Sequence, residues 1–414
     1  MNKELTDWNK YWGHAWQPVP EVGRIDVRDY TSPEVFAKEK EKIFRKTWLM
    51  VARQSEVAEP GDFIKIDVPT LDTEVVIVRG KDGVIRSFYN ACPHRGVALV
   101  RQCEGKAGLF VCPYHAWSFA TDGKLKGMPG AEDFPHVDKS KVILTPIHTD
   151  VWNDYIFINF AETPKQSLAE YMGEFGTYFD DMPFGEYARA VDIIQDLPTN
   201  WKNFNDAFNE GYHVQVLHPK SLPMVPTRIN PLNHMYDPIY LAPHSSATIQ
   251  SNTDWVPTGK VMLFVYASTG VSFIHVDGPE EQAAKPRLFT TARGINRIGL
   301  PNYSTSTMNF FPLSQFQILA DRYMWLRYWP LSPDKTRFIV RMYFGAPPRS
   351  HLEEFAEAFQ LASTRDVFTE DVSMTRLQQQ GMKSGGVKEV VLGENEHMIR
   401  FTTQMIRDYM NAED

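Results

Sequence analysis

The chain is poor in cysteine, has no long apolar run and carries no excess of positive charge. Its 414 residues include only three cysteines, which are too few for a disulfide framework. The formal net charge of −8 argues against nucleic acid as the main partner, because phosphate binding needs a basic surface. No apolar run approaches the roughly 18 residues of a membrane span. The first residues, MNKELTDWNKYW, lack the apolar core of a signal peptide, so we expect a cytoplasmic protein.

The composition that remains is that of a globular enzyme. Hydrophobic residues make up 43% of the chain and charged residues 23%, which are ordinary values for folded domains. The length is sufficient for two or three domains of ordinary size. The cysteines Cys92, Cys103 and Cys112 lie within about twenty residues of one another, and in such a chain this clustering indicates a metal site.

The pattern of strands and helices predicts an α+β protein with three segments. Residues 1–45 read as an N-terminal helical segment, in which Ser32 and Pro33 begin a helix whose Lys/Glu run we expect to be solvated. Residues 46–162 alternate short strands and tight turns, as in a small all-β domain. Residues 163–414 are mixed. There we expect strands at 188–197, 260–267, 287–294 and 336–345, and helices at 199–213, 350–380 and 394–412.

Two Cys/His pairs in the all-β segment form a candidate four-ligand cage. Cys92 and His94 are followed, after seventeen intervening residues, by Cys112 and His115. Structural zinc would accept two cysteines and two histidines, but its usual pairs are each of one residue type. A [2Fe–2S] cluster with both thiolates on one iron and both imidazoles on the other takes one Cys and one His from each loop. The spacing therefore favours the mixed-ligand cluster.

The stretch CPHRG…CPYHAW resembles the Rieske motif of ring-hydroxylating, non-haem iron oxygenases. The resemblance implies that Cys92, His94, Cys112 and His115 bind a Rieske [2Fe–2S] cluster. It also implies that the all-β segment is a Rieske domain, and that 163–414 is a catalytic domain with an antiparallel sheet flanked by helices. Cys103 matches no ligand position.

A second set of polar residues lies in the segment FNEGYHVQVLHP. If 199–219 is one helix, Asp206, Glu210 and His213 share a face, because they are spaced i, i+4 and i+7. His218 lies five residues after His213, about 140° away around a helix. One metal could bind both histidines only if the helix loosens or ends between them, which Pro219 after His218 favours. On the residues alone, a shared metal and two separately satisfied histidines both remain open.

The stretch NWKNFNDAFNEGYHVQVLHP is similar to the catalytic-domain signature of the same oxygenases. In that family two histidines and a downstream carboxylate bind a mononuclear Fe(II). The resemblance assigns these roles to His213, His218 and Asp371, the last within TEDVSMTRLQQQG. Glu370 and Asp366 are then expected to be solvated or ion-paired.

The resemblance gives Glu210 a different role. In this family a carboxylate at that position links the two metal centres across a subunit interface, here by accepting hydrogen bonds from His115 of one subunit and His213 of the next. This implies a head-to-tail homotrimer, with or without a small beta subunit. Electrons would come from NAD(P)H through a separate reductase and possibly a ferredoxin.

The expected activity is that of a terminal oxygenase. It would use O₂ and reductase-derived electrons to mono- or cis-dihydroxylate an aromatic or other hydrophobic substrate, as in aromatic hydrocarbon catabolism. The alternative is oxidative demethylation or C–N cleavage of a quaternary amine, by monooxygenases that also use a glutamate bridge. A non-catalytic Rieske electron carrier or a zinc-stabilised binding protein is a remote third interpretation. The sequence does not distinguish the substrate, the number of oxygen atoms inserted, the reductase or the subunit composition.

Overall fold

The computed structural model of the protein describes residues 21–222, 235–250, 260–261, 292–297, 303–319, 322–345 and 347–413. The chain folds into two compact units, one formed by Met1–Glu39 with Met172–Asp414 and the other by Lys40–Tyr171. The strands expected at 260–267 and 287–294 lie almost entirely outside the described residues. Within the described part of the chain, no helix has both the length and the apolar character needed to cross a membrane.

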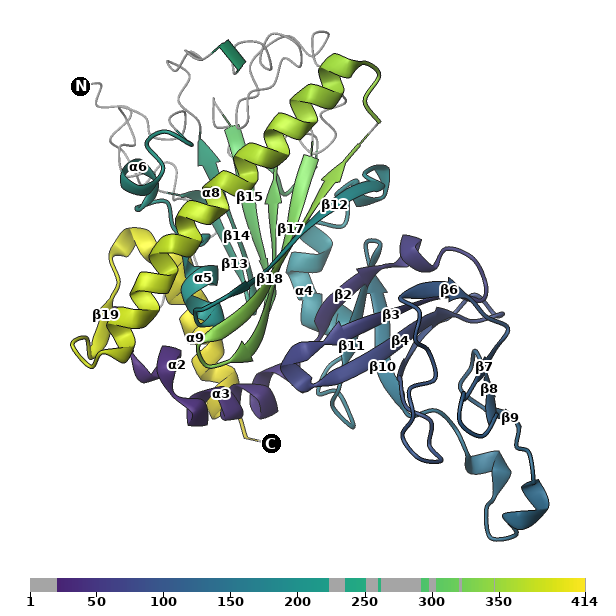
Figure 1. Ribbon diagram of the computed structural model, residues 1–414. Helices are drawn as coiled ribbons and strands as arrows, with labels where there is room; N and C mark the ends of the chain where they lie inside the picture. Colours follow the sequence, from purple (N-terminus) through teal and green to yellow (C-terminus); the bar gives the residue numbers. More distant parts are fainter. Residues whose placement is uncertain are drawn as a thin grey trace, which may run out of the picture. The chain divides into compact units, whose positions relative to one another are not determined.

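The unit Lys40–Tyr171 is built on antiparallel strands (Figure 1). Its larger sheet has seven strands in the order β2 (Leu49–Arg53), β11 (Tyr155–Asn159), β10 (Pro146–Trp152), β5 (Ile85–Tyr89), β4 (Thr73–Arg79), β3 (Asp62–Val68) and β6 (Glu104–Lys106). A two-residue turn joins β10 to β11, with Asn153 and Asp154 at φ of 42° and 76°. These two residue types tolerate the left-handed conformation that tight hairpins require.

A second, three-stranded antiparallel sheet carries half of the cysteine–histidine motif. It consists of β7 (Leu109–Val111), β8 (Ser118–Ala120) and β9 (Leu125–Gly127). Cys112 and His115 lie in the loop between β7 and β8, whereas Cys92 and His94 follow β5 of the larger sheet. One apolar cluster, including Phe63, Phe88 and Phe119, packs around both cysteines. The expectation of a small all-β fold with its cysteine–histidine pairs on loops is confirmed.

In the described part of the other unit, seven strands form one antiparallel sheet. Its order is β12 (Arg189–Leu197), β18 (Lys335–Phe344), β17 (Arg322–Ser332), β16 (Ser314–Ile318), β15 (Tyr303–Phe310), β14 (His244–Gln250) and β13 (Tyr236–Leu241). Along β18 the buried residues Thr336, Phe338, Val340 and Met342 alternate with more exposed ones, as the period of a strand requires. The strands expected at 188–197 and 336–345 are both present.

Helices pack around this sheet. The 33-residue helix α8 (His351–Lys383) crosses one face of it, with the short helix α5 (Trp201–Ala207) on the same side (Figure 1). Ser350 caps α8 by accepting a hydrogen bond from the backbone N–H of Glu353. The other α-helices among the described residues are α2 (Arg28–Thr31), α3 (Pro33–Glu39), α4 (Leu168–Tyr178), α6 (Val214–Leu217) and α9 (His397–Asn411), and β1 (Arg24–Asp26) pairs with β19 (Glu389–Val391). The α+β class and both C-terminal helices are confirmed.

The N-terminal helix follows the prediction at its start and departs from it at its end. Ser32 Oγ accepts the backbone N–H of Val35, and Pro33 is the first residue of α3. The Lys/Glu run is not wholly solvated, because Glu39 is 1% exposed. Its carboxylate pairs with the buried Lys202 ammonium and accepts a 3.1 Å hydrogen bond from Trp201 Nε1. This ion pair ties α3 to the first turn of α5.

We expect Glu39→Gln to destabilise the protein by about 3–5 kcal/mol, because it leaves the Lys202 ammonium buried without a charged partner. The thermal unfolding midpoint measures the change. The matched control is Glu41→Gln in the same segment, where the side chain is 67% exposed and pairs with Arg45. That control should change stability by less than about 1 kcal/mol. Equal midpoints for the two variants would contradict the structural role of the pair.

Candidate metal centres

The segment that carries Glu210, His213 and His218 is not one helix. The prediction of a helix over 199–213 is correct only for its first half, because α5 ends at Ala207 and α6 begins only at Val214. Asp206, Glu210 and His213 therefore do not share a helix face. The helix breaks earlier than expected, before Glu210, and His213 and His218 flank the separate turn α6 that follows.

Local hydrogen bonds explain the break. The side-chain amide of Asn209 donates to the backbone carbonyl and the side-chain oxygen of Asn205, which competes with continuation of the helix. Glu210 then accepts the backbone N–H of His213 at 3.1 Å, as a capping side chain does at the start of a helix. His213 and His218 flank the single turn of α6 as its two cap residues.

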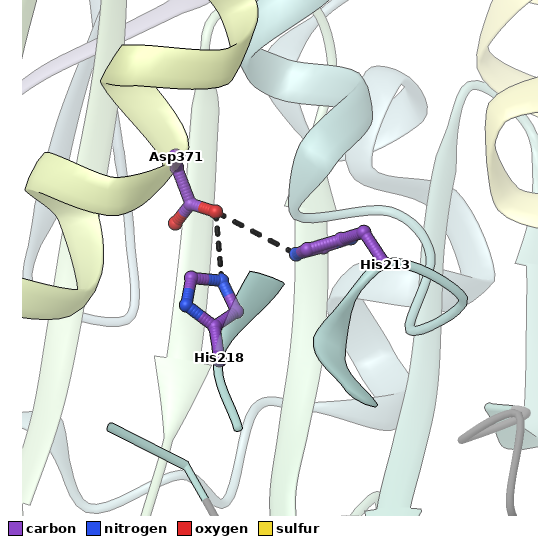
Figure 2. Close-up of side chains that lie close together, drawn as sticks. All are labelled: His213, His218 and Asp371. Atoms are coloured by element: carbon purple, nitrogen blue, oxygen red, sulfur yellow. Dashed lines mark hydrogen bonds and ion pairs between the residues drawn. The ribbon is translucent and has the colours of Figure 1, made fainter. Parts of the chain in front are cut away.

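This arrangement brings both histidines to Asp371 on α8. The two imidazole centroids are 5.2 Å apart. One oxygen of Asp371 lies 2.9 Å from His218 Nε2 and 3.6 Å from His213 Nε2 (Figure 2). The possible ligand atoms of the three residues lie within 4.8 Å of one another. Two histidines and one carboxylate on one side of a cavity are the ligand set of non-haem Fe(II) oxygenases.

Two further carboxylates orient the imidazoles. His218 Nδ1 hydrogen-bonds Glu370 at 2.6 Å, and His213 Nδ1 hydrogen-bonds Glu210. Each imidazole thus donates its Nδ1–H outward and turns Nε2 toward Asp371, as metal-binding histidines do. The expectation that Glu370 would be solvated or ion-paired misses this contact with His218. Its position directly before Asp371 on one helix was the available signal.

The charge around His218 favours a cation. Burial alone would lower the pKa of this imidazole, but its hydrogen bonds to Asp371 and Glu370 outweigh burial and raise it. His218 is 1% exposed and Asp371 is 3% exposed, so their charges are poorly screened by water. A bound divalent cation would compensate the negative charge of the carboxylates that surround His218.

The two Cys/His loops have the same backbone design. The carbonyl of Cys92 accepts the N–H of Gly96, and that of Cys112 accepts the N–H of Ala116. The N–H of Cys92 donates to the carbonyl of Val97, and the N–H of Cys112 donates to the carbonyl of Trp117, in each case five residues further along the chain. Gly96 and Ala116 both have positive φ, of 75° and 59°. Two loops with matching turns therefore present their thiols, both buried, from one apolar cluster.

The histidines of these loops fit a mixed-ligand cluster. Their ring centroids are 4.6 Å apart, and Nδ1 of His94 and of His115 is buried without a hydrogen-bond partner in the part of the chain that the structure describes. A buried ring nitrogen without a protein partner is a cost that a metal bond removes. Burial lowers the pKa of His115, with contributions from His94 and Arg95, which favours the neutral imidazole that binds metal. Trp117 stacks on His94 at 4.6 Å, a contact that the motif alone did not reveal.

Two other polar residues do not join these centres. Cys103 is exposed and free, so it remains outside the candidate cluster site. Asp206 is half-buried and accepts a 2.9 Å hydrogen bond from Tyr30. Burial raises the pKa of Asp206 to about 7, although the Tyr30 hydrogen bond acts in the opposite direction.

A cavity of about 120 Å³ adjoins the histidine–carboxylate site. His213, His218 and Asp371 line it together with mostly apolar side chains from α8, the sheet and the α5–α6 segment. These include Phe208, Leu222, Leu319, Val367 and Phe368. An apolar cavity beside a candidate metal centre is suited to a small organic ligand.

Comparison with known protein families agrees with both centres. Residues 184–412, more than half of the chain, match the family described as ring hydroxylating alpha subunit (catalytic domain), and residues 47–141 match the Rieske [2Fe-2S] domain. The chain belongs to the ring hydroxylating alpha subunits. Its cofactors are accordingly a Rieske [2Fe–2S] cluster and a mononuclear iron.

Individual relatives of this alpha subunit include both mono- and dioxygenases. The carnitine monooxygenase oxygenase subunit of Escherichia coli strain K12 is 35% identical over 48% of this chain and 53% of the relative. The benzene 1,2-dioxygenase subunit alpha of Pseudomonas putida is 34% identical over 46% of this chain and 43% of the relative. The matched segment thus spans about half the length of these curated relatives.

Solved structures show the same fold over nearly the whole alpha subunit. A quaternary ammonium Rieske monooxygenase aligns with a TM-score of 0.74 and 22% identity, covering 94% of this chain and 95% of the other. Naphthalene 1,2-dioxygenase from Rhodococcus sp. aligns with a TM-score of 0.70 and 20% identity, covering 94% and 95%. Both the predicted Rieske fold and the predicted antiparallel catalytic fold are therefore confirmed.

We expect Asp371→Ala to lower the content of mononuclear iron and to leave the visible spectrum of the cluster intact, because it removes the carboxylate shared by both histidines. Iron analysis together with absorption spectroscopy measures the two effects. The matched control is Asp366→Ala on the same helix, whose side chain is 64% exposed and pairs with Arg365. Loss of iron in the control, or its retention in Asp371→Ala, would contradict the ligand assignment.

Proposed function

We propose that this alpha subunit is a terminal oxygenase that hydroxylates an aromatic or other hydrophobic small molecule with O₂ and electrons from a reductase. The observation that carries the proposal is the convergence of His213, His218 and Asp371 at one end of an apolar cavity. The same chain also holds the two cysteine–histidine loops, so it has both a site for electrons and a site for substrate. Insertion of one or of two oxygen atoms is compatible with this arrangement.

Each residue has a defined part in the proposal. Cys92, His94, Cys112 and His115 would hold the cluster, and His213, His218 and Asp371 would hold the iron. The bound groups supply one-electron transfer and activation of O₂. Glu210 and Glu370 keep the Nδ1 protons of the two iron-binding histidines in place, which leaves each Nε2 unprotonated. The apolar cavity wall excludes water and positions the substrate beside the ligands.

Glu210 has a second part, as the link between the two centres. Within one chain it already hydrogen-bonds His213. We propose that its carboxylate also accepts a hydrogen bond from His115 of a neighbouring subunit, in a head-to-tail homotrimer. Such contacts close into a ring when the rotation between subunits permits. A separate reductase, with or without a ferredoxin, would supply electrons from NAD(P)H.

The domain boundaries and the cellular location belong to the same proposal. Residues 1–45 would form a helical segment that packs with the catalytic domain, 46–162 the Rieske domain and 163–414 the catalytic domain. The ion pair between Glu39 and Lys202 supports the first of these assignments. The three free cysteines are compatible with a reducing cytoplasm.

Oxidative demethylation or C–N cleavage of a quaternary amine is the second candidate. It is favoured by the 35% identity to carnitine monooxygenase oxygenase subunits over about half the chain. A quaternary ammonium group is bound by aromatic faces or carboxylates. Among the described residues lining the cavity, Phe208 and Phe368 are the aromatic ones.

Metal content and product analysis test the proposed function. We expect a reddish-brown protein with about three iron atoms per chain, two in the cluster and one at the triad. With purified reductase, a panel of aromatic hydrocarbons and quaternary amines should give at least one product heavier by one or two oxygen atoms, or one demethylated amine. A colourless, zinc-containing protein would contradict the proposal, and an iron protein without any product would leave only an electron carrier.

We expect Glu210→Ala to retain both metals but to lose about 10- to 100-fold in turnover, because it removes the carboxylate that orients His213 and links the centres. Steady-state product formation and iron analysis measure the two effects. Glu210→Asp is the matched variant, and it should recover part of the activity because it keeps a carboxylate with a shorter side chain. Normal coupling of NADH oxidation to product in Glu210→Ala would show that the bridge assignment is wrong.

A further inference from the structure

The cavity beside the candidate iron has a polar wall that the proposed reaction does not use. Strands β15 and β16 turn alternate side chains toward it, as their period requires. On that face Thr305, Thr307 and Asn309 of β15 lie next to Gln317 and Gln315 of β16. All five are buried, yet none is a candidate metal ligand.

These side chains form a chain of amide hydrogen bonds. Gln315 donates to Asn309 at 2.7 Å and to Asn209 at 3.3 Å. Asn309 donates to Asn209 at 2.6 Å and to Ser245 at 3.1 Å. Gln315 therefore uses both of its N–H groups, and so does Asn309. This interior part of the wall has no donor left for a ligand.

Gln317 lies at the cavity end of this chain and differs from its neighbours. Its side-chain oxygen accepts the hydroxyl of Thr307 at 3.1 Å, which fixes the orientation of the amide. One N–H reaches Gln315 at 3.4 Å, and the other has no partner among the described residues. Gln317 is 9% exposed and lines the cavity. An oriented donor is thus left facing the ligand space.

A second unpartnered group enters the cavity from α8. Thr364, Val367, Phe368 and Asp371 are spaced i, i+3, i+4 and i+7, so they share the helix face that lines the cavity. Thr364 is 1% exposed, and its hydroxyl has no hydrogen-bond partner among the described residues. Helical threonines commonly bond a carbonyl one turn back. Thr375 of the same helix does so with the carbonyl of Asp371.

The position of Thr364 relative to the metal site sets the geometry of a ligand. Asp371 lies seven positions after Thr364, which corresponds to about 10 Å along the helix axis. A molecule lying along this face would place one end beside the candidate iron and a polar group toward Thr364. A buried hydroxyl or amide N–H that stays unpaired is costly, so a ligand that accepts their hydrogen bonds is favoured.

The charged groups around the cavity limit further which ligands it can bind. Among its described lining residues there is no lysine or arginine, and the charged groups are Glu210 and Asp371 with the two histidines. A carboxylate on the ligand would therefore be buried without a cationic partner among these residues. A neutral acceptor such as a carbonyl oxygen has no such penalty and matches the two donors.

We propose that Gln317 and Thr364 determine substrate specificity, and that the substrate is an uncharged, mostly apolar molecule carrying a carbonyl-type acceptor away from the carbon that reacts. This inference rests on the proposed function for the identity of the reacting end. The hydrogen bonds themselves require only that the molecule binds in the cavity.

Binding of two matched probes tests the proposal. Acetophenone and α-methylstyrene have nearly the same shape but differ in having C=O or C=CH₂. Equilibrium dialysis of the iron-loaded protein without O₂ should show about three- to tenfold tighter binding of acetophenone, the value of one net neutral hydrogen bond. Gln317→Leu and Thr364→Val should each reduce this preference toward unity while leaving the affinity for α-methylstyrene similar or higher.

The matched control is Thr305→Val. Thr305 lines the same cavity, but its hydroxyl already donates to the Ile318 carbonyl at 2.8 Å, so the variant should keep the wild-type preference. The proposal is overturned if the wild type shows no preference, binds neither probe, or keeps its preference in both Gln317→Leu and Thr364→Val. If the wild type prefers acetophenone as expected but no substrate gives an oxygenated product, the result contradicts the proposed oxygenase activity and leaves the binding proposal intact.

Discussion

The interruption of the helix between Ala207 and Val214 is the constraint on which the candidate iron site depends. His213 and His218 lie after this interruption and flank the single turn of α6, and Nε2 of each imidazole lies within 3.6 Å of one oxygen of Asp371. Asn209 ends α5 by bonding back to Asn205, and Glu210 begins α6 by accepting the His213 N–H. The same few residues therefore set the backbone path and deliver both imidazoles to Asp371.

Glu210 joins local folding to chemistry in a way that its sequence position did not reveal. One carboxylate oxygen accepts the backbone N–H of His213, and the other binds Nδ1 of the same residue. A substitution there affects both the cap of α6 and the tautomer of a ligand. For this reason Glu210→Asp is more informative than Glu210→Ala about the proposed electron transfer. Glu210→Asp keeps the negative charge and only shortens the side chain, whereas Glu210→Ala removes both the charge and the length.

Much of the fold could be predicted because its signals are local. The β-branched runs of β3 and β4, the Asn153–Asp154 turn and the Ser32 cap are each encoded within a few residues. The burial of Glu39 could not be predicted in this way, because its partner Lys202 lies 163 residues further along the chain. A lysine–glutamate pattern that suits a solvated helix suits a buried ion pair equally well.

In the candidate sites, too, features encoded locally could be predicted and features that depend on distant contacts could not. The ligand residues could be named from spacing and resemblance, whereas the helix break, Glu370 and Trp117 depend on contacts between elements distant in sequence. Adjacent residues on α8 show why. Glu370 and Asp371 point about 100° apart around the helix, and His218 lies between them with one ring nitrogen on each.

The polar wall of the cavity extends this reasoning from the metal to the substrate. Asn209 belongs both to the turn that positions Glu210 and to the amide chain that ends at Gln317. Asn309 and Gln315 use both of their N–H groups within this network, so each fixes the orientation of the next amide. The network therefore fixes the position of the Gln317 side-chain N–H relative to the turn that carries His213. The proposed recognition of a substrate acceptor by Gln317 and the placement of the candidate ligand His213 thus depend on one buried network, although the two residues lie on different elements of the fold.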